Sequence, residues 1–205
     1  MESFTRVTGI AAPLLRNNID TDQIIPTRFL ARLSEDGLGE GLFAEWRNRA
    51  DGTPDPDFPL HRAPWDQAQI LVGGASFGCG SSREAAPRAL RQNGFRAVVA
   101  PSFGDIFYGN CFRNGMLPVR LPDEAVRRIG ALLESAPEQG RLTVDLESET
   151  VTVPATGEVL AFSTPPMLRR MLLEGLDEIE LTLKNRAAID SHRAADRARR
   201  PWAYA

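Results

Sequence analysis

The sequence predicts an α/β fold with parallel strands. The main observation is an apolar strand pattern at 70–72, followed by a glycine-rich loop, a helical stretch over 83–92 and a second strand pattern at 96–100. This order is typical of a βαβ unit, whose two strands are parallel and joined by a right-handed crossover. The second observation is a change near Gly140 to alternating apolar and polar residues, which indicates a β-meander.

The ends of the first helix can be predicted from its flanking residues. Asn93 and Gly94 form a pair that suits a left-handed C-cap. Pro87 fits only the first turn of a helix, because proline lacks the N–H that a later turn requires. Regular helix is therefore expected to begin near Glu84 or Ala85.

Two further helices and a strand are expected beyond this unit. Ser102 is the expected N-cap of a helix that runs to Asn114. A strand at 116–121 follows. Asp123 is the expected N-cap of the next helix, because apolar residues recur after it at helical spacing.

We expect a single domain over residues 1–190 and a charged, helical, solvated tail over 191–205. The domain begins with a strand at 6–15. A long excursion at 31–63 is rich in glycine, proline and charge, and is expected to carry one short helix at 42–48. Such an excursion in a compact chain is either disordered or used for binding.

The composition limits the possible partners. Hydrophobic residues make up 42% of the chain and charged residues 25%, as in average soluble domains. Acidic residues outnumber basic ones by 27 to 24, so a nucleic-acid partner is disfavoured. Two cysteines indicate a reducing compartment, and no apolar run approaches the roughly 20 residues that span a bilayer. A cytoplasmic chain without a membrane partner is expected.

The strongest local feature is the segment 77–84, Phe-Gly-Cys-Gly-Ser-Ser-Arg-Glu, between the first strand and helix of the unit. Unpaired amides at a helix N-terminus favour an anion, and glycines let the backbone approach a ligand closely. Ser81 and Ser82 add hydroxyl groups, and Arg83 adds a planar fork that fits a carboxylate. The pattern indicates an anion site with a hydroxyl beside it. The alternative is a capping box from Ser81 to Glu84.

Other chemistries are disfavoured by what the sequence lacks. Segment 77–84 has no lysine of a Walker A loop, no third glycine of a dinucleotide fingerprint and no nucleophile elbow. His61 and His192 lie in the excursion and the tail, which disfavours a serine–histidine–aspartate triad. Cys79 and Cys111 are too few to hold an iron–sulfur cluster, so no metal site is expected in this chain.

Asp20 and Asp22 form a second candidate, since two carboxylates two residues apart resemble an acid–base pair or metal ligands. In a turn, the same spacing is more often an Asx-turn with solvated charges. Both interpretations stay open at the level of sequence.

Three motifs occur in a fixed order: 18–26 (Asn-Ile-Asp-Thr-Asp-Gln-Ile-Ile-Pro), 77–84, and 101–110 (Pro-Ser-Phe-Gly-Asp-Ile-Phe-Tyr-Gly-Asn). Together they resemble the small subunits of the isopropylmalate dehydratase family, in the aconitase superfamily. The resemblance runs from about Thr5 to Ile189 and implies the swivelling β/β/α fold of the aconitase C-terminal domain. It also implies a hydro-lyase of leucine biosynthesis that interconverts 2- and 3-isopropylmalate through 2-isopropylmaleate.

The resemblance also implies roles for individual residues. Ser81 aligns with the base, an ionised serine that removes a C–H proton, and Arg83 is expected to stabilise that alkoxide and to pair with a substrate carboxylate. Ser82 and Gly80 are expected to bind substrate, although the two serines could exchange roles. In the loop 33–43, the residues expected to contact the isopropyl group are apolar: Leu38, Leu42 and Phe43.

The resemblance implies a separate large subunit that carries a [4Fe–4S] cluster, which agrees with the low cysteine count here. The chain departs from the family at Ala85, where the usual residue is histidine. This change is either silent or the mark of a related diacid substrate, such as citraconate/2-methylmalate, homoaconitate or a dimethylmalate. In a different class of function, the loop could serve only as an anion nest in a noncatalytic module.

Overall fold

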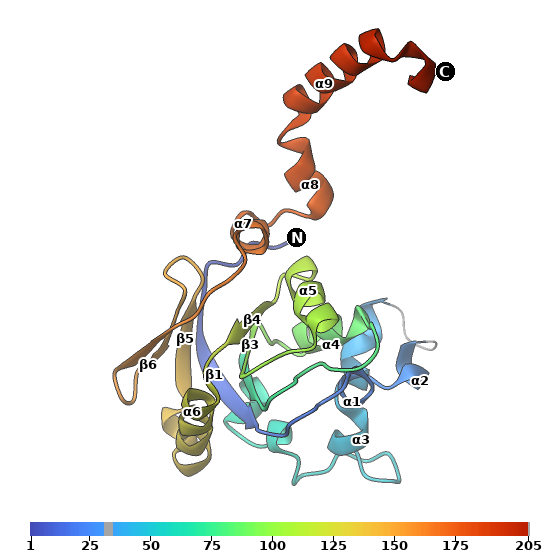
Figure 1. The fold of residues 1–205 in the computed structure, drawn as a ribbon. Helices are drawn as coiled ribbons and strands as arrows, with labels where there is room; N and C mark the ends of the chain where they lie inside the picture. Colours follow the sequence, from blue (N-terminus) through green and yellow to red (C-terminus); the bar gives the residue numbers. More distant parts are fainter. Residues whose placement is uncertain (31–34, 205) are drawn as a thin grey trace.

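The fold is built on one mixed sheet of seven strands (Figure 1). The structure is a computed structural model and describes residues 1–30 and 35–204. Their order across the sheet is β4-β3-β2-β1-β5-β6-β7. The strands are β1 Arg6–Leu14, β2 Ile70–Gly73, β3 Ala97–Ala100, β4 Leu117–Arg120, β5 Arg141–Asp145, β6 Thr150–Val153 and β7 Glu158–Ala161. The predicted α/β class and the predicted meander after Gly140 are both confirmed.

Strand β1 joins two halves of different type. Its residues 11–14 pair in parallel with β2, and β2, β3 and β4 continue that parallel half. Its residues 6–10 pair antiparallel with β5, and β6 and β7 continue the meander. The strands of the parallel half are almost wholly buried, as expected where helices cover both faces of a sheet.

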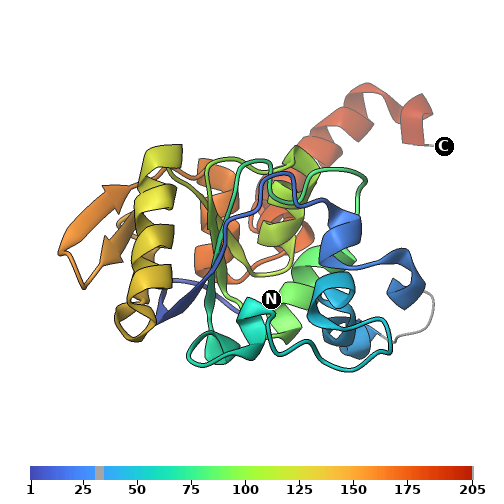
Figure 2. The same cartoon turned by 90° about the horizontal axis from the view of Figure 1, so that it is seen from below.

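Helices cover both faces of this parallel half. The helix α6 lies on one side of β1, and α4 and α5 lie on the other (Figure 2). The helices are α1 Thr21–Ile24, α2 Thr27–Leu30, α3 Ala44–Arg47, α4 Ala85–Gln92, α5 Asp105–Arg113, α6 Asp123–Ser135, α7 Pro166–Glu174, α8 Glu178–Leu183 and α9 Arg186–Arg199. As predicted, α4 begins at Ala85, has Asn93 as its C-cap, and is followed by Gly94 at a φ of +90°.

Two predicted N-caps are wrong. The helix α5 has Gly104 as its N-cap, because the hydroxyl of Ser102 instead accepts a hydrogen bond from the Ser76 N–H at 2.8 Å. Pro122 occupies the cap position of α6, so Asp123 is the first helical residue. The Asp123 carboxylate pairs with the Arg127 guanidinium one turn later, at 2.8 Å.

The described part of the predicted excursion is packed against the domain. It contains the short helix α3 and the 3₁₀ turns Glu35–Gly41 and Pro59–His61, and a further turn, Trp65–Gln67, follows it. Several of its apolar residues join the core: Leu38, Leu42, Phe43, Ala44 and Phe58. Residues 31–34 of the excursion, including the start of the loop 33–43, lie outside the described residues.

The C-terminal helices α8 and α9 project away from the sheet (Figures 1 and 2). The helix α9 carries the predicted charged tail, and all but one of its side chains are at least partly exposed to solvent. Of the helices described, none is long and apolar enough to cross a membrane.

Candidate functional site

Three loops meet where the parallel strands end. Residues 15–20 follow β1, residues 74–84 follow β2 and residues 101–104 follow β3. The carboxyl ends of neighbouring parallel strands share one edge of a sheet, which is where ligands of α/β proteins commonly bind. The three sequence motifs therefore converge at one place in the fold.

Backbone hydrogen bonds hold the first loop against the second. The Gly78 N–H donates to the Ile19 carbonyl at 2.7 Å, and the Thr21 N–H donates to the Cys79 carbonyl at 2.9 Å. The Thr21 hydroxyl donates to the carbonyl oxygen of Ser81, also at 2.9 Å. Thr21 is buried, so this bond anchors the backbone of the serine itself.

The third loop closes on the second from the other side. The Phe77 N–H donates to the Ser102 carbonyl at 3.0 Å, and the Gly104 N–H donates to the Phe77 carbonyl at 2.9 Å. A Cβ at Gly104 would lie 2.5 Å from the Gly78 carbonyl oxygen, so only glycine fits there. The buried ring of Phe107 packs beside Gly78 and Phe77. Sequence reasoning missed this packing, for which the phenylalanines of the third motif were the available signal.

Ser81 and Ser82 are exposed at the surface of this assembly. Neither hydroxyl takes part in a hydrogen bond within the part of the chain that the structure describes. The alternative of a Ser81–Glu84 capping box is wrong, because no side chain caps α4 and Glu84 instead accepts a bond from Arg88 at 2.8 Å. Both serine hydroxyls are therefore available to a ligand.

Arg83 follows the serines in the chain, and one nitrogen of its guanidinium is bound within the protein. Its side chain is only 12% exposed, and its Nη1 donates to the Ile25 carbonyl at 3.0 Å and pairs with the Asp22 carboxylate. The hydrogen bond from Arg83 lowers the pKa of Asp22 below its usual value. Nε and Nη2 of Arg83 have no partner among the described residues, which leaves one edge of the fork open to a carboxylate.

Asp20 and Asp22 are both engaged in holding the loop. Asp20 is the N-cap of α1: it accepts from the Gln23 N–H at 2.7 Å, and the Gln23 side chain accepts from the Asp20 N–H at 3.1 Å. Asp22 pairs with Arg83 as described above. Each carboxylate thus has a structural partner, in place of the expected Asx-turn with solvated charges: Asp20 caps a helix and Asp22 anchors a guanidinium.

Gly80 lies in the serine loop at a φ of +94°, a left-handed conformation that favours glycine. It is exposed and follows Cys79 directly, so its backbone is accessible beside the serines. Ala85, the departure from the family pattern, begins α4 and is partly buried against the core. A ligand that binds Ser81 and Ser82 would therefore contact a segment of chain that is flanked by Gly80 and Ala85.

The three apolar residues expected to contact the isopropyl group lie in the core: Leu38, Leu42 and Phe43. Near Leu38, the Gly39 N–H donates to the Gln92 side chain at 2.6 Å and the Gly39 carbonyl accepts from Asn93 at 2.8 Å. This contact is at the C-terminal end of α4, whereas the serines precede its N-terminal end. Eight helical residues span about 12 Å, so the structure places Leu38 away from the serines.

A cavity of about 90 Å³ lies behind this part of the core, and Leu42 and Phe43 line it together with Phe58 and Trp65. Both residues therefore border a pocket. Their contact with a ligand stays a prediction.

The cysteines do not form a cluster-binding set. Cys111 is fully buried in α5, and this burial raises the pKa of its thiol well above the usual value. Cys79 is partly buried in the serine loop. Among the described residues, no three histidine, cysteine or acidic side chains are grouped so as to hold a metal ion. A cluster that needs three or four thiolates does not fit the residues of this chain.

Comparison with known proteins gives consistent matches. Residues 1–124 match the family model of the aconitase C-terminal domain. A 3-isopropylmalate dehydratase small subunit from Roseobacter denitrificans is 50% identical over 205 residues, with 98% of this chain and all of that protein covered. One from Cupriavidus necator is 52% identical and covers 100% of this chain and 99% of its own length. A crystal structure of 3-isopropylmalate dehydratase from Methanocaldococcus jannaschii has a TM-score of 0.63 at 28% identity, over 92% of this chain and 99% of that one.

Proposed function

Because the chain belongs to the family of 3-isopropylmalate dehydratase small subunits, we propose that it interconverts 2- and 3-isopropylmalate, as one subunit of a cytoplasmic enzyme of leucine biosynthesis. The matches to these small subunits confirm the family resemblance that the three sequence motifs indicate. The observation that supports the proposal best is the pair of free serine hydroxyls beside a fixed guanidinium, at the meeting point of three loops.

Ser81 is the proposed base. It takes the proton from the substrate C–H bond on its Oγ and returns a proton when water adds again in the other orientation. A serine hydroxyl is a weak acid, so its ionised form needs stabilisation. The nearby Arg83 charge and the positive end of the α4 helix dipole provide a positive field at this position. The Thr21 hydroxyl holds the Ser81 backbone in place without occupying Oγ.

Arg83 is the proposed carboxylate-binding residue. Asp22 and the Ile25 carbonyl hold its Nη1, so the guanidinium is already oriented before a ligand arrives. Its free edge can then donate two parallel hydrogen bonds to one carboxylate of the diacid. Ser82 and Gly80 are proposed to complete the contact with substrate, through a hydroxyl and a backbone N–H.

The second subunit of the proposed enzyme is a large subunit with a [4Fe–4S] cluster, which would supply Lewis-acid chemistry at the leaving hydroxyl. The present chain has too few thiolates to hold such a cluster. We therefore expect the purified chain to be colourless and inactive by itself. Iron and sulfide assays check this, and a brown protein that turns over isopropylmalate alone would contradict the two-subunit assignment.

The proposed function is tested by reconstitution with the large subunit. Turnover of 2-isopropylmalate should appear only in the complex, when a panel of diacids is assayed. The panel also includes 2-methylmalate, homoaconitate and dimethylmalate, because Ala85 next to the serine loop favours a related diacid as the second candidate. A complex that binds diacids but neither dehydrates nor hydrates any of them would leave only the noncatalytic anion-binding alternative.

Leu38 tests the origin of substrate preference. Leu38→Ala should destabilise the fold by about 2–5 kcal/mol, since the side chain is buried. If the proposed contact exists, it should also lower the preference for the isopropyl over the methyl substrate by about 10-fold or more. Leu142→Ala, an equal truncation in β5, is the control and should affect stability alone. Equal kcat/KM ratios in both variants would show that another part of the enzyme sets the preference.

A further inference from the structure

The C-terminal arm, residues 176–204, projects from the domain (Figure 1). Its helices are held by hydrogen bonds and ion pairs between its own residues. A capping box starts α8: Asp177 accepts from the Glu180 N–H at 2.7 Å, and the Glu180 side chain accepts from the Asp177 N–H at 2.8 Å. Arg186 pairs with Asp190 at 2.9 Å within α9. Every hydrogen bond and ion pair described for residues 190–204 stays inside the arm.

The tip of the arm is locked by a single buried carboxylate. Asp196 accepts from Nε and Nη2 of Arg200 at 2.8 and 2.7 Å, and from the Tyr204 hydroxyl at 2.8 Å. These bonds fold the final turn, Pro201–Tyr204, back onto α9. The arm therefore holds a defined shape without help from the domain, which lowers the entropy that binding would cost.

This shaped arm presents apolar groups to solvent. Trp202 at its tip is 74% exposed, and Ile179 and Leu183 are exposed on one face of α8, one turn apart. On the same arm, Arg193 and Arg197 line a hollow with Tyr204. Tryptophan, tyrosine and arginine are the residue types most enriched among those that contribute most at protein interfaces.

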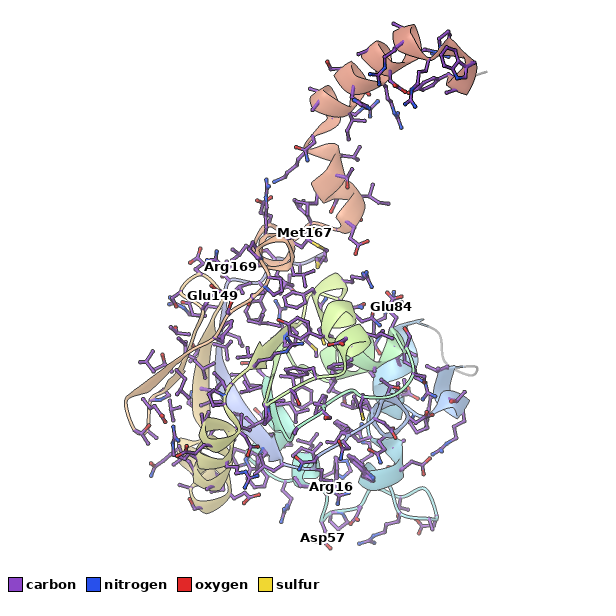
Figure 3. The ribbon with its side chains drawn as sticks, viewed as in Figure 1. Arg16, Asp57, Glu84, Glu149, Met167 and Arg169 are labelled. Atoms are coloured by element: carbon purple, nitrogen blue, oxygen red, sulfur yellow. The ribbon has the colours of Figure 1, made fainter. Side chains whose placement is uncertain are left out.

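The base of the arm lies on the same side of the domain as the serine loop. Arg113, at the end of α5, pairs with Glu178 of α8 at 2.9 Å. The next residue, Asn114, accepts from Arg88 at 3.0 Å, and Arg88 pairs with Glu84, two residues after Ser82. Figure 3 shows Glu84 at the edge of the domain beside α5, on the side from which the arm extends. A subunit that covers the serine loop would therefore lie within the arm's reach.

We infer that the C-terminal arm is a docking element, which binds an apolar, acidic surface of the same partner subunit that covers the serine loop. The inference rests on the proposed two-subunit function. The acidic character of the partner surface is inferred from the outer part of the arm alone, since residues 186–200 contain five arginines and two aspartates. The Cupriavidus necator relative aligns over 100% of this chain, so the arm belongs to the length shared with a small subunit.

The test measures the Kd between the full-length chain and the large subunit. Trp202→Ala should raise this Kd by at least about 10-fold. It should leave the melting temperature of the isolated chain unchanged, because the indole is exposed. Val159→Ala, which truncates an exposed apolar residue of β7, is the matched control and should leave the Kd unchanged within twofold. The charge variant Arg193→Glu/Arg197→Glu should weaken binding as well, and binding should weaken as salt rises.

Failure of this inference can be told apart from failure of the proposed function. Ser81→Ala should bind the large subunit with unchanged Kd while turnover is lost, whereas Trp202→Ala should need more large subunit for half-maximal turnover. A Kd that depends on Trp202 supports the docking role even if isopropylmalate proves the wrong substrate. An unchanged Kd for Trp202→Ala overturns it, as does a dimer of the isolated chain that this variant alone dissociates, which would assign the arm to a second copy.

Discussion

Replacing Ser81 with alanine is expected to lower kcat for hydration of 2-isopropylmaleate by about 10²–10⁴, the usual contribution of a general base. The variant removes one hydroxyl that has no partner in the described chain, so the fold loses no hydrogen bond. Arg83 keeps its contacts with Asp22 and Ile25, and diacid binding should persist. The measurement is steady-state turnover of the reconstituted complex, with cluster content determined by absorbance.

Ser82→Ala is the matched control for this experiment. It removes the same atoms from the next residue, which is also exposed, and should reduce turnover less than Ser81→Ala does. A larger loss at Ser82 would exchange the roles of the two serines. If Ser81→Ala retains most of its activity at full cluster loading, serine is not the base in this enzyme.

Gly78→Ala is expected to destabilise the fold by at least about 3 kcal/mol, through left-handed backbone strain and overpacking in the core. Gly78 has a φ of +70°, and a Cβ there would overlap the buried ring of Phe107. The ring cannot move away easily, since Phe77 and Phe103 pack against it. Because the same backbone joins the three loops, the variant should also lose activity below its melting temperature.

Gly157 separates the two causes of this loss. It has a similar φ of +74°, in the turn between β6 and β7, but a Cβ there would meet no atom within 4 Å. Gly157→Ala should therefore show the backbone strain alone, roughly 1–2 kcal/mol. Thermal or denaturant unfolding of both variants makes the comparison. Equal losses of stability at the two positions would mean that the overlap with Phe107 adds nothing to the cost of the Gly78 substitution.

The sequence predicts this fold well where local and tertiary preferences agree. The start of α4 follows from Pro87, and its end follows from Asn93 and Gly94. Ser102 is the opposite case: its hydroxyl could cap a helix, but it binds the Ser76 N–H of another loop instead. The Ser81–Glu84 capping box fails in the same way, because the Thr21 hydroxyl, 60 positions away, holds the Ser81 carbonyl and no side chain caps α4. Such choices between partners are decided by residues distant in sequence.

The candidate site also combines features that the sequence predicts with features that only the fold brings together. Ser81, Ser82 and Arg83 are adjacent in the chain, so their proximity follows from the sequence. The anchoring of Arg83 by Asp22 joins residues that are 61 positions apart, and no local pattern indicates it. Leu38 is the converse case: the sequence predicts a contact with substrate, whereas the structure shows its side chain in the core, so the contact stays a prediction.

The divided pairing of β1 links the site to a distant part of the chain. Residues 1–124, which match the family model, contain all three loops. Yet residues 6–10 of β1 pair with β5 at 141–145, and a chain that stops at 124 would leave those N–H and C=O groups as an open edge. During synthesis, the serines, the guanidinium and their anchors emerge long before that edge can be closed. The nascent chain therefore carries a ready template for intermolecular strand addition until the meander arrives, and the interval from the third loop at 101–104 to β5 at 141–145 is set by how fast about forty residues are added.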